Sequence, residues 1–126
     1  MSQNARLRNS ADFRAVYSKG SRFEGHLVSV FVLPNGLNQH RLGITASRKM
    51  SRRAVDRNRA KRLIREAFRL NETGLNTLKD RYDWVFNARR PTIGKNLDDM
   101  IKELQSVLGR VIQNELRVIS VNEVGE

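Results

Sequence analysis

The most informative stretch of the chain is Ala54–Leu70, which reads AVDRNRAKRLIREAFRL. Apolar residues recur in it at helical spacing, at Ala60, Leu63, Ile64, Ala67 and Phe68 or Leu70. This spacing is typical of an amphipathic helix that turns one side to a hydrophobic core. The stretch therefore predicts a helix over residues 54 to 70, packed on other elements of one domain.

The opposite side of this helix is strongly basic. Arg57, Lys61 and Arg65 are four residues apart, so they form one line, about 6 Å per step, close to the phosphate spacing of an extended nucleotide strand. Between Arg41 and Leu70 there are 11 basic and two acidic residues, which account for +9 of the chain's net charge of +11. A surface with this much charge is typical of proteins that bind a polyanion, and nucleic acid is the leading candidate. Asn58 in this face is suited to reading a base edge or bracing a carbonyl.

The composition of the 126 residues limits the other classes of protein. The length predicts a single domain covering residues 1–126. The chain has no cysteine, which excludes disulfides and thiolate metal sites. The first residues, MSQNARLRNS, have no apolar h-region like that of a signal peptide, and no apolar run approaches the roughly 18 residues that span a bilayer. We therefore expect a cytoplasmic location and no membrane partner.

The N-terminal half predicts one helix followed by two or three strands. The helix covers Ser10–Lys19, with Ser10 as the N-cap. The β-branched run His26–Leu33 predicts a strand, and a turn at residues 34–36 favours an antiparallel pair with Arg41–Ser47. Residues 20–24 are a candidate edge strand.

The C-terminal half predicts a strand and a second long helix. Residues 71–77 contain Gly74 and interrupt the first long helix. The segment Arg81–Ala88 alternates in a way that predicts a strand with one aromatic face. Asn96 is the expected N-cap of a helix whose apolar stripe continues to Val111. Residues 112–126 could extend that helix, add a strand or remain loose. The fold class is α+β, in the order helix, two or three strands, helix, strand, helix.

The basic helix also carries a family resemblance. Residues 54–69 resemble the signature A-V-x-R-N-R-x-K-R-x-x-R-E-x-F-R of the bacterial ribonuclease P protein component. Shorter matches occur in family order at Arg6-Leu7, Asp12-Phe13, Leu42–Ile44, Ser47–Lys49 and Tyr82–Phe86. The resemblance covers residues 6 to about 110. Arg53, where many members have glycine, and the bulky Trp84 depart from the pattern without touching its R-N-R core.

The resemblance implies a function and a topology. Members of this family are subunits of ribonuclease P, in which a large catalytic RNA removes the 5′ leader from precursor tRNA. The resemblance implies that Mg²⁺ is held mainly by that RNA, that the protein supplies no catalytic residue or metal site, and that it needs no obligate protein partner. It also implies a single α/β layer in which the strands before and after the R-N-R helix are parallel and joined by a left-handed crossover. The residues alone favour the usual right-handed connection.

The resemblance also assigns roles to individual residues. The expected contacts to the catalytic RNA are Arg48, Lys49, Arg52, Arg53, Arg57, Asn58, Arg59, Lys61, Arg62, Arg65 and Arg69. The expected leader cleft uses Phe13, Tyr17 and Phe31, with Arg57, Asn58, Lys61 and Arg65 at its rim. Aromatic side chains beside a basic line suit a single strand of variable sequence, because stacking tolerates any base. The residues themselves leave a core-packing role for these aromatics open.

Two other functions remain as alternatives. The chain could be a nuclease in its own right, but His26, His40 and Asp98-Asp99 do not have the spacing of a metal site. It could also be a ribosomal or other structural RNA-binding protein, because charge and size do not separate these classes.

Overall fold

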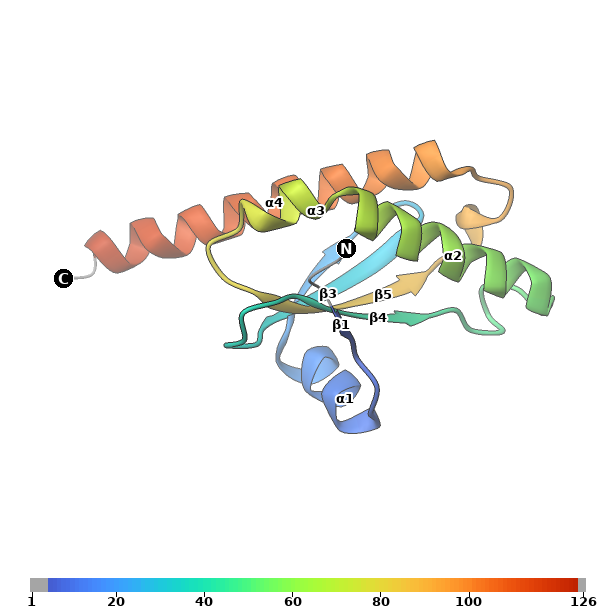
Figure 1. Cartoon of the computed structure of the whole chain (residues 1–126), viewed down its shortest axis with the longest axis horizontal. Helices are drawn as coiled ribbons and strands as arrows, with labels where there is room; N and C mark the ends of the chain where they lie inside the picture. Colours follow the sequence, from blue (N-terminus) through green and yellow to red (C-terminus); the bar gives the residue numbers. More distant parts are fainter. Residues whose placement is uncertain (1–4, 125–126) are drawn as a thin grey trace.

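The structure is a computed structural model that describes the backbone of residues 5–124 and the side chains of residues 5–117. A single sheet is flanked by helices on both faces (Figure 1). The elements, in chain order, are β1 (Ala5–Arg6), α1 (Ser10–Lys19), β2 (Ser21–Glu24), β3 (Val28–Pro34), β4 (Arg41–Thr45), α2 (Ala54–Leu70), α3 (Glu72–Asn76), β5 (Tyr82–Ala88), the 3₁₀ turn η1 (Arg90–Thr92) and α4 (Leu97–Val124). The predicted α+β class and the bounds of α1 and α2 are confirmed.

The strand order is β1-β4-β5-β3-β2, which corrects one prediction. The expected hairpin between 26–33 and 41–47 does not form, because β5 lies between β3 and β4 and pairs antiparallel with β3 and parallel with β4. Burial explains the position of β5. Trp84 and Phe86 are fully buried on one face of this strand and Val85 on the other. A strand that buries apolar side chains on both faces is most stable at the centre of the sheet. The candidate edge strand is confirmed as β2.

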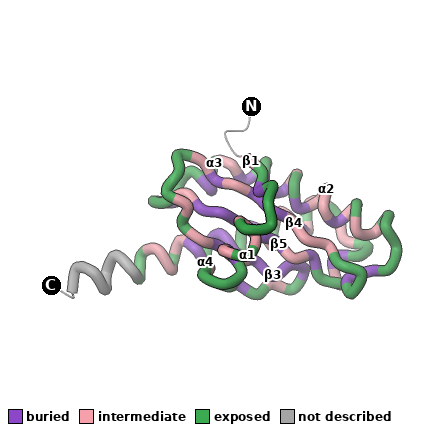
Figure 2. The backbone as a smooth tube through the Cα atoms, turned by 90° about the horizontal axis from the view of Figure 1, so that it is seen from below, coloured by how far each residue is buried: buried purple, intermediate pink, exposed green. Residues whose placement is uncertain are grey.

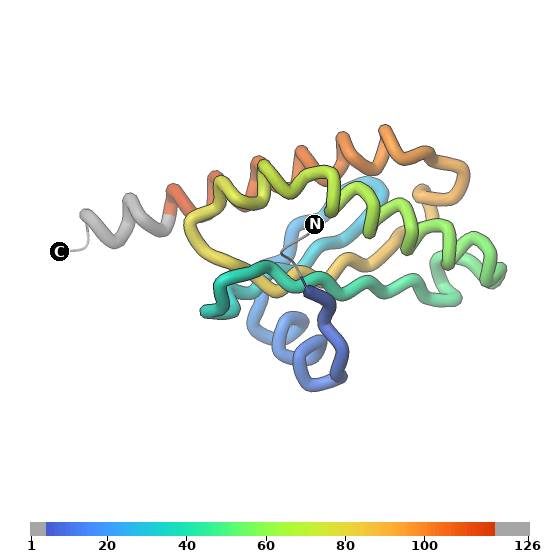
Figure 3. Tube along the Cα trace, in the orientation of Figure 1, coloured from blue at the N-terminus to red at the C-terminus, as the bar shows by residue number. Residues whose placement is uncertain are grey.

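The connection from β4 through α2 to β5 is the expected left-handed crossover. Both strands run from left to right in Figure 3, and α2 returns above them. β4 lies nearer to the viewer than β5 in Figure 1, and the view from below in Figure 2 gives the same order. Passing from the front strand over the top to the strand behind is a left-handed turn.

The helices divide the interior into two clusters. On one face, α2 and α4 cover the sheet, and Ile64, Phe68 and Leu104 pack on Trp84 and Phe86. On the other face, α1 covers a smaller cluster built from Val16, Leu7 and Val85. The predicted aromatic face of β5 is therefore confirmed, and its opposite face is buried as well (Figure 2).

Several boundaries differ from the predictions. The N-cap of α1 is Asn9 rather than Ser10, because the Asn9 side chain accepts a hydrogen bond from the Asp12 amide at 2.9 Å. The predicted cap of α4 is confirmed, since Asn96 and Asp99 each bond the other's backbone amide. Residues 71–77 contain the short helix α3, and β1 was not predicted. Of the three alternatives for residues 112–126, the structure shows a helix to Val124, and residues 125–126 lie outside the described part.

Candidate nucleic-acid interface

The outer side of α2 carries most of the predicted RNA contacts. Ala60, Ile64, Ala67 and Phe68 are buried and Leu63 packs on the same core, so the charged residues between them lie on the outer side of the helix. Two of the predicted cations contact carboxylates, since Arg69 is paired with Glu66 and Arg53 lies 4.0 Å from Asp56. The other predicted cations have no carboxylate of residues 5–117 within ion-pair distance. They are Arg48, Lys49, Arg52, Arg57, Arg59, Lys61, Arg62 and Arg65. These cations are therefore available to contact a polyanion.

Arg57 has a second role that its position in the basic line did not reveal. Its guanidinium donates hydrogen bonds to the carbonyls of Ser51 and Arg52, at 3.0 and 2.9 Å. The Ser51 hydroxyl donates to Asp56 at 2.8 Å and accepts from the Arg53 amide at 3.1 Å. These bonds fix the linker between β4 and α2. Arg48, Lys49 and Arg52 are exposed on that linker, which extends the basic surface beyond the helix.

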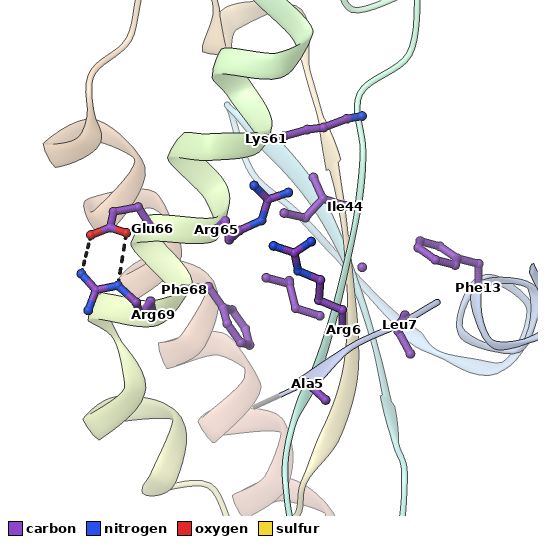
Figure 4. Close-up of a pocket in the computed structure, with 12 residues that line it drawn as sticks. Ala5, Arg6, Leu7, Phe13, Ile44, Lys61, Arg65, Glu66, Phe68 and Arg69 are labelled. Carbon is purple, nitrogen blue, oxygen red and sulfur yellow. Dashed lines mark hydrogen bonds and ion pairs between the residues drawn. The ribbon is translucent and has the colours of Figure 1, made fainter. Parts of the chain in front are cut away.

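A pocket lies between α2 and the edge of the sheet formed by β1 and β4. Its volume is about 430 Å³, and Leu42, Ile44 and Phe68 are among its apolar lining residues. Lys61 and Arg65 extend from α2 toward β4, and Arg6 reaches the same space from β1 (Figure 4). The one carboxylate in its lining, Glu66, is paired with Arg69. Three cations beside an apolar floor form a site suited to a phosphate flanked by a base or sugar.

Tyr17 and Phe31 meet on the opposite face of the sheet, beside α1. Their ring centroids are 5.0 Å apart in an edge-to-face arrangement. The Tyr17 hydroxyl donates to the Asn87 side chain at 2.6 Å and lies 3.3 Å from the Thr45 hydroxyl. Arg22 lies over the Phe31 ring, 5.5 Å from its centroid. The bonds fix the tyrosine, and with 39% of the residue exposed its ring remains accessible for stacking.

Phe13 lies between these two sites. Its ring rests on Gly43 of β4, so close that a Cβ at Gly43 would be 2.6 Å from the tip of the ring. Phe13 also lines the pocket that contains Lys61 and Arg65.

The seven residues expected in one leader cleft therefore do not line a single cavity. Phe13, Tyr17 and Phe31 all lie on the α1 face, and of these three Phe13 also lines the edge pocket with Lys61 and Arg65. Arg57 is bonded to the linker. Asn58 is exposed near the start of α2 and also lies outside the pocket.

Four further basic residues near these sites were not predicted as contacts. Arg6 belongs to the resemblance but had no assigned role, and Arg22 lies in the edge strand β2. Arg89 and Arg90 are exposed at the end of β5. Arg6 and Arg22 each stand next to a buried apolar residue, Leu7 and Phe23, and this alternation is a signal that the sequence does contain.

The groups considered for a self-contained nuclease do not form a site. His40 is fully buried, and burial lowers the pKa of its imidazole. Asp99 caps α4, and Asp98 is paired with Lys102 at 3.2 Å. The described residues contain no group of three His, Cys, Asp or Glu side chains that could hold a metal ion. No helix in the described part of the chain is long and apolar enough to cross a membrane.

The fold and the exposed cationic surface define a small α+β protein built to bind RNA. Residues 1–112 match the family model described as Ribonuclease P, and the chain belongs to that family. It is a protein component of ribonuclease P, the endoribonuclease that matures the 5′ end of tRNA, and its partner is the ribonuclease P RNA.

Relatives and solved structures agree with this assignment. The ribonuclease P protein component of Clostridium kluyveri is 38% identical over 82% of this chain and 90% of its own length. That of Methylococcus capsulatus is 40% identical over 79% of this chain and 75% of its own. The RNase P proteins of Staphylococcus aureus and Thermotoga maritima, 30% and 28% identical, each superpose with a TM-score of 0.72. These cover 84% and 83% of this chain, and 94% and 96% of the respective solved chains. The comparisons favour ribonuclease P over the ribosomal alternative.

Proposed function

We propose that this chain binds the catalytic RNA through its linker and α2, and holds the single-stranded 5′ leader of precursor tRNA at the α1 face and the edge pocket. The observation that carries the proposal is the adjacency of unpaired cations to accessible aromatic rings. Phe13 lines one pocket with Lys61 and Arg65, and Tyr17 contacts Phe31 beside it on the α1 face of the sheet. Cations track a backbone while rings accept any base, which is what a leader of variable sequence requires.

The catalytic RNA would meet the widest part of the basic surface. The exposed groups there are mostly arginines, which make forked contacts with phosphate. Arg57 supports this contact indirectly, because its bonds to the Ser51 and Arg52 carbonyls hold the linker in place. We assign these contacts to Arg48, Lys49, Arg52, Arg53, Asn58, Arg59 and Arg62, with Arg69 held back by Glu66.

The leader would follow the other surface. Stacking on Tyr17 and Phe31 would hold bases, and Arg6, Lys61 and Arg65 would neutralise a phosphate in the edge pocket. A bound mature tRNA has no leader to fill these positions. The chain would therefore favour precursor over product by binding alone.

The expectation that this chain holds no metal ion of its own stays a prediction. The described part offers no group of three ligating side chains, so we derive no step through a protein-bound ion. Our proposal leaves the Mg²⁺ of the holoenzyme with the RNA, and leaves this chain the tasks of binding and orienting substrate. The cytoplasmic location and the lack of an obligate protein partner remain predictions.

Reconstitution tests the proposal. The chain is combined with its ribonuclease P RNA, and cleavage of a tRNA precursor is measured at low Mg²⁺ with and without protein. We expect faster cleavage and tighter binding of precursor with the protein present. Equal stimulation for a precursor with a leader of one nucleotide and for one with a long leader would contradict leader binding. Cleavage by the purified protein without RNA would instead favour a self-contained nuclease.

A further inference from the structure

A second basic groove lies at the edge of the sheet opposite to β1. It is formed where α4 passes the edge strand β2, and its volume is about 260 Å³. Arg22, Phe23, Arg110, Gln113, Asn114 and Arg117 line it. All three charged residues in this lining are arginines. The groove therefore offers forked cationic donors and two amides around one aromatic ring.

The donors on α4 repeat at helical spacing. Arg110, Asn114 and Arg117 are separated by four and three residues, so they lie along one side of the helix. The one carboxylate between them in sequence, Glu115, faces elsewhere, because it accepts hydrogen bonds from the Lys79 and Asp80 amides at 2.9 and 3.1 Å. This side of α4 repeats the arrangement of the basic line on α2.

Two of the arginines are held in position. Arg110 donates to the Glu24 carbonyl at 2.6 Å and lies over the Phe23 ring, 5.5 Å from its centroid. Arg22 is paired with the Glu24 carboxylate at 2.5 Å, and that carboxylate also accepts from the Ser29 hydroxyl at 2.7 Å. Arg117 is exposed and makes no ion pair with a carboxylate among residues 5–117.

The positive charge of the groove favours an anionic partner. The guanidinium of Arg22 is paired with Glu24 and lies over Phe31, so Arg110 and Arg117 supply the two positive charges of the groove. An isolated excess of this kind is unfavourable unless an anion covers it. The amides of Gln113 and Asn114 add donors and acceptors that suit phosphate and ribose hydroxyls.

We propose that the groove between β2 and α4 is a second RNA-binding surface that holds a phosphate backbone. It is independent of α2, because α2 packs over β4 and β5 whereas α4 reaches β2. Three strand spacings, about 14 Å, separate β4 from β2, so one large RNA, the catalytic RNA, can contact both surfaces. The inference rests on the proposed function only in that the chain works beside RNA.

Arg117 is the residue to test, since Arg110 also covers the edge of β2. Arg117→Gln and Arg117→Glu are compared with Lys102→Gln and Lys102→Glu, which make the same charge changes on α4 about 22 Å away. Binding is measured against salt with the catalytic RNA alone, and with precursor and mature tRNA on the reconstituted holoenzyme. With the catalytic RNA, we expect Arg117→Gln to flatten the log-affinity against log-salt slope by about 1, and Arg117→Glu to weaken binding further.

The arms identify the source of the RNA. A change with the catalytic RNA alone supports the proposal, and a change with both tRNAs but not with the catalytic RNA overturns it. If the Arg117 variants match the Lys102 variants in every arm while wild-type holoenzyme is active, this inference fails and the proposed function stands. Loss of binding to anionic lipid vesicles with no change for RNA would also overturn it. Thermal melting of each variant checks that the fold is retained.

Discussion

The guanidinium of Arg41 makes two hydrogen bonds with the carboxylate of Asp83, at 2.7 and 2.6 Å, across the parallel pair of β4 and β5. The same guanidinium lies 3.5 Å from Asp12 of α1, and Asn35 donates to Asp83 at 3.0 Å. These contacts join the first helix to the two central strands. The hydrogen bonds to Asp83 raise the pKa of the Arg41 guanidinium.

Arg41→Ala should destabilise the fold more than loss of an exposed pair. The Asp83 side chain is only 6% exposed and would be left with an unpaired charge, so we expect a loss of about 3 kcal/mol in the free energy of unfolding. Lys102→Gln breaks an exposed pair and should change that free energy by less than about 0.5 kcal/mol. Urea denaturation of both variants gives the comparison. Equal stability for the two would show that the buried pair does not anchor α1.

His40 should make stability depend on pH. Its Nδ1 accepts hydrogen bonds from the Tyr82 amide and the Trp84 indole, both at 3.0 Å, which assigns the neutral form with the proton on Nε2, 3.2 Å from the Leu75 carbonyl. Protonating Nδ1 would remove that acceptor. Burial accordingly lowers the pKa of His40 below its ordinary value of 6.5.

The direction of the effect follows from proton binding. Below about pH 6.5 the unfolded chain binds a proton at His40 that the folded chain excludes, so stability is full above that pH. It should fall by up to about 1.4 kcal/mol per pH unit as the pH drops toward the folded-state pKa. Denaturant midpoints measured from pH 7.5 to 5 for wild type and His40→Gln test this. The exposed His26→Gln is the control and should keep the wild-type dependence, whereas the same acid loss in His40→Gln would assign the effect to other groups.

Gly43 is in close contact with the Phe13 ring, whereas Gly109 has open space around it, so the two glycines test whether the position of Phe13 matters. Gly43→Ala would place a Cβ 2.6 Å from the Phe13 ring and 3.1 Å from Leu7. We expect a loss of about 1–3 kcal/mol in stability and weaker discrimination of precursor from mature tRNA. Gly109→Ala meets nothing within 4 Å on α4 and should stabilise the helix by about 1 kcal/mol. A neutral Gly43→Ala in both assays would mean that Phe13 moves freely.

The elements that could be predicted from the sequence are those whose signal lies within one short segment. The periodicity of Ala54–Leu70 lies within one helix, and its bounds were predicted correctly. Strand order is set by contacts distant in sequence, so the short turn at 34–36 favoured a hairpin that the burial of Trp84 and Val85 overrides. β1 is only two residues long and carries no periodicity.

In the site, too, local features were predictable and contacts set by the tertiary structure were not. The basic line on α2 was evident because charge density is local. The bonds from Arg57 to the linker carbonyls depend on how the linker folds back on the helix, and Arg22 reaches Phe31 only through the pairing of β2 with β3. Tertiary placement also separated the expected leader residues between two faces of the sheet.

Lys61 and Arg65 should account for part of the salt dependence of RNA binding. Neither is paired with a carboxylate among residues 5–117, and both line the edge pocket. The double change to Ala should flatten the log-affinity against log-salt slope by about 1.5–2. Arg69→Ala, on the same helix but paired with Glu66, should leave the slope nearly unchanged. If the double variant keeps the wild-type slope, the edge pocket is not part of the interface.

Tyr17 separates a stacking role from a packing role. Tyr17→Leu removes the ring, and Tyr17→Phe removes only the hydroxyl that donates to Asn87. If the ring stacks on a leader base, Tyr17→Leu should weaken binding of precursor tRNA by about 1–3 kcal/mol and leave mature tRNA unaffected. Tyr17→Phe should keep most of the precursor affinity, because the edge-to-face contact with Phe31 holds the ring. Equal losses for precursor and mature tRNA in Tyr17→Leu, together with a lower melting temperature, would assign the tyrosine to the core of the α1 face instead.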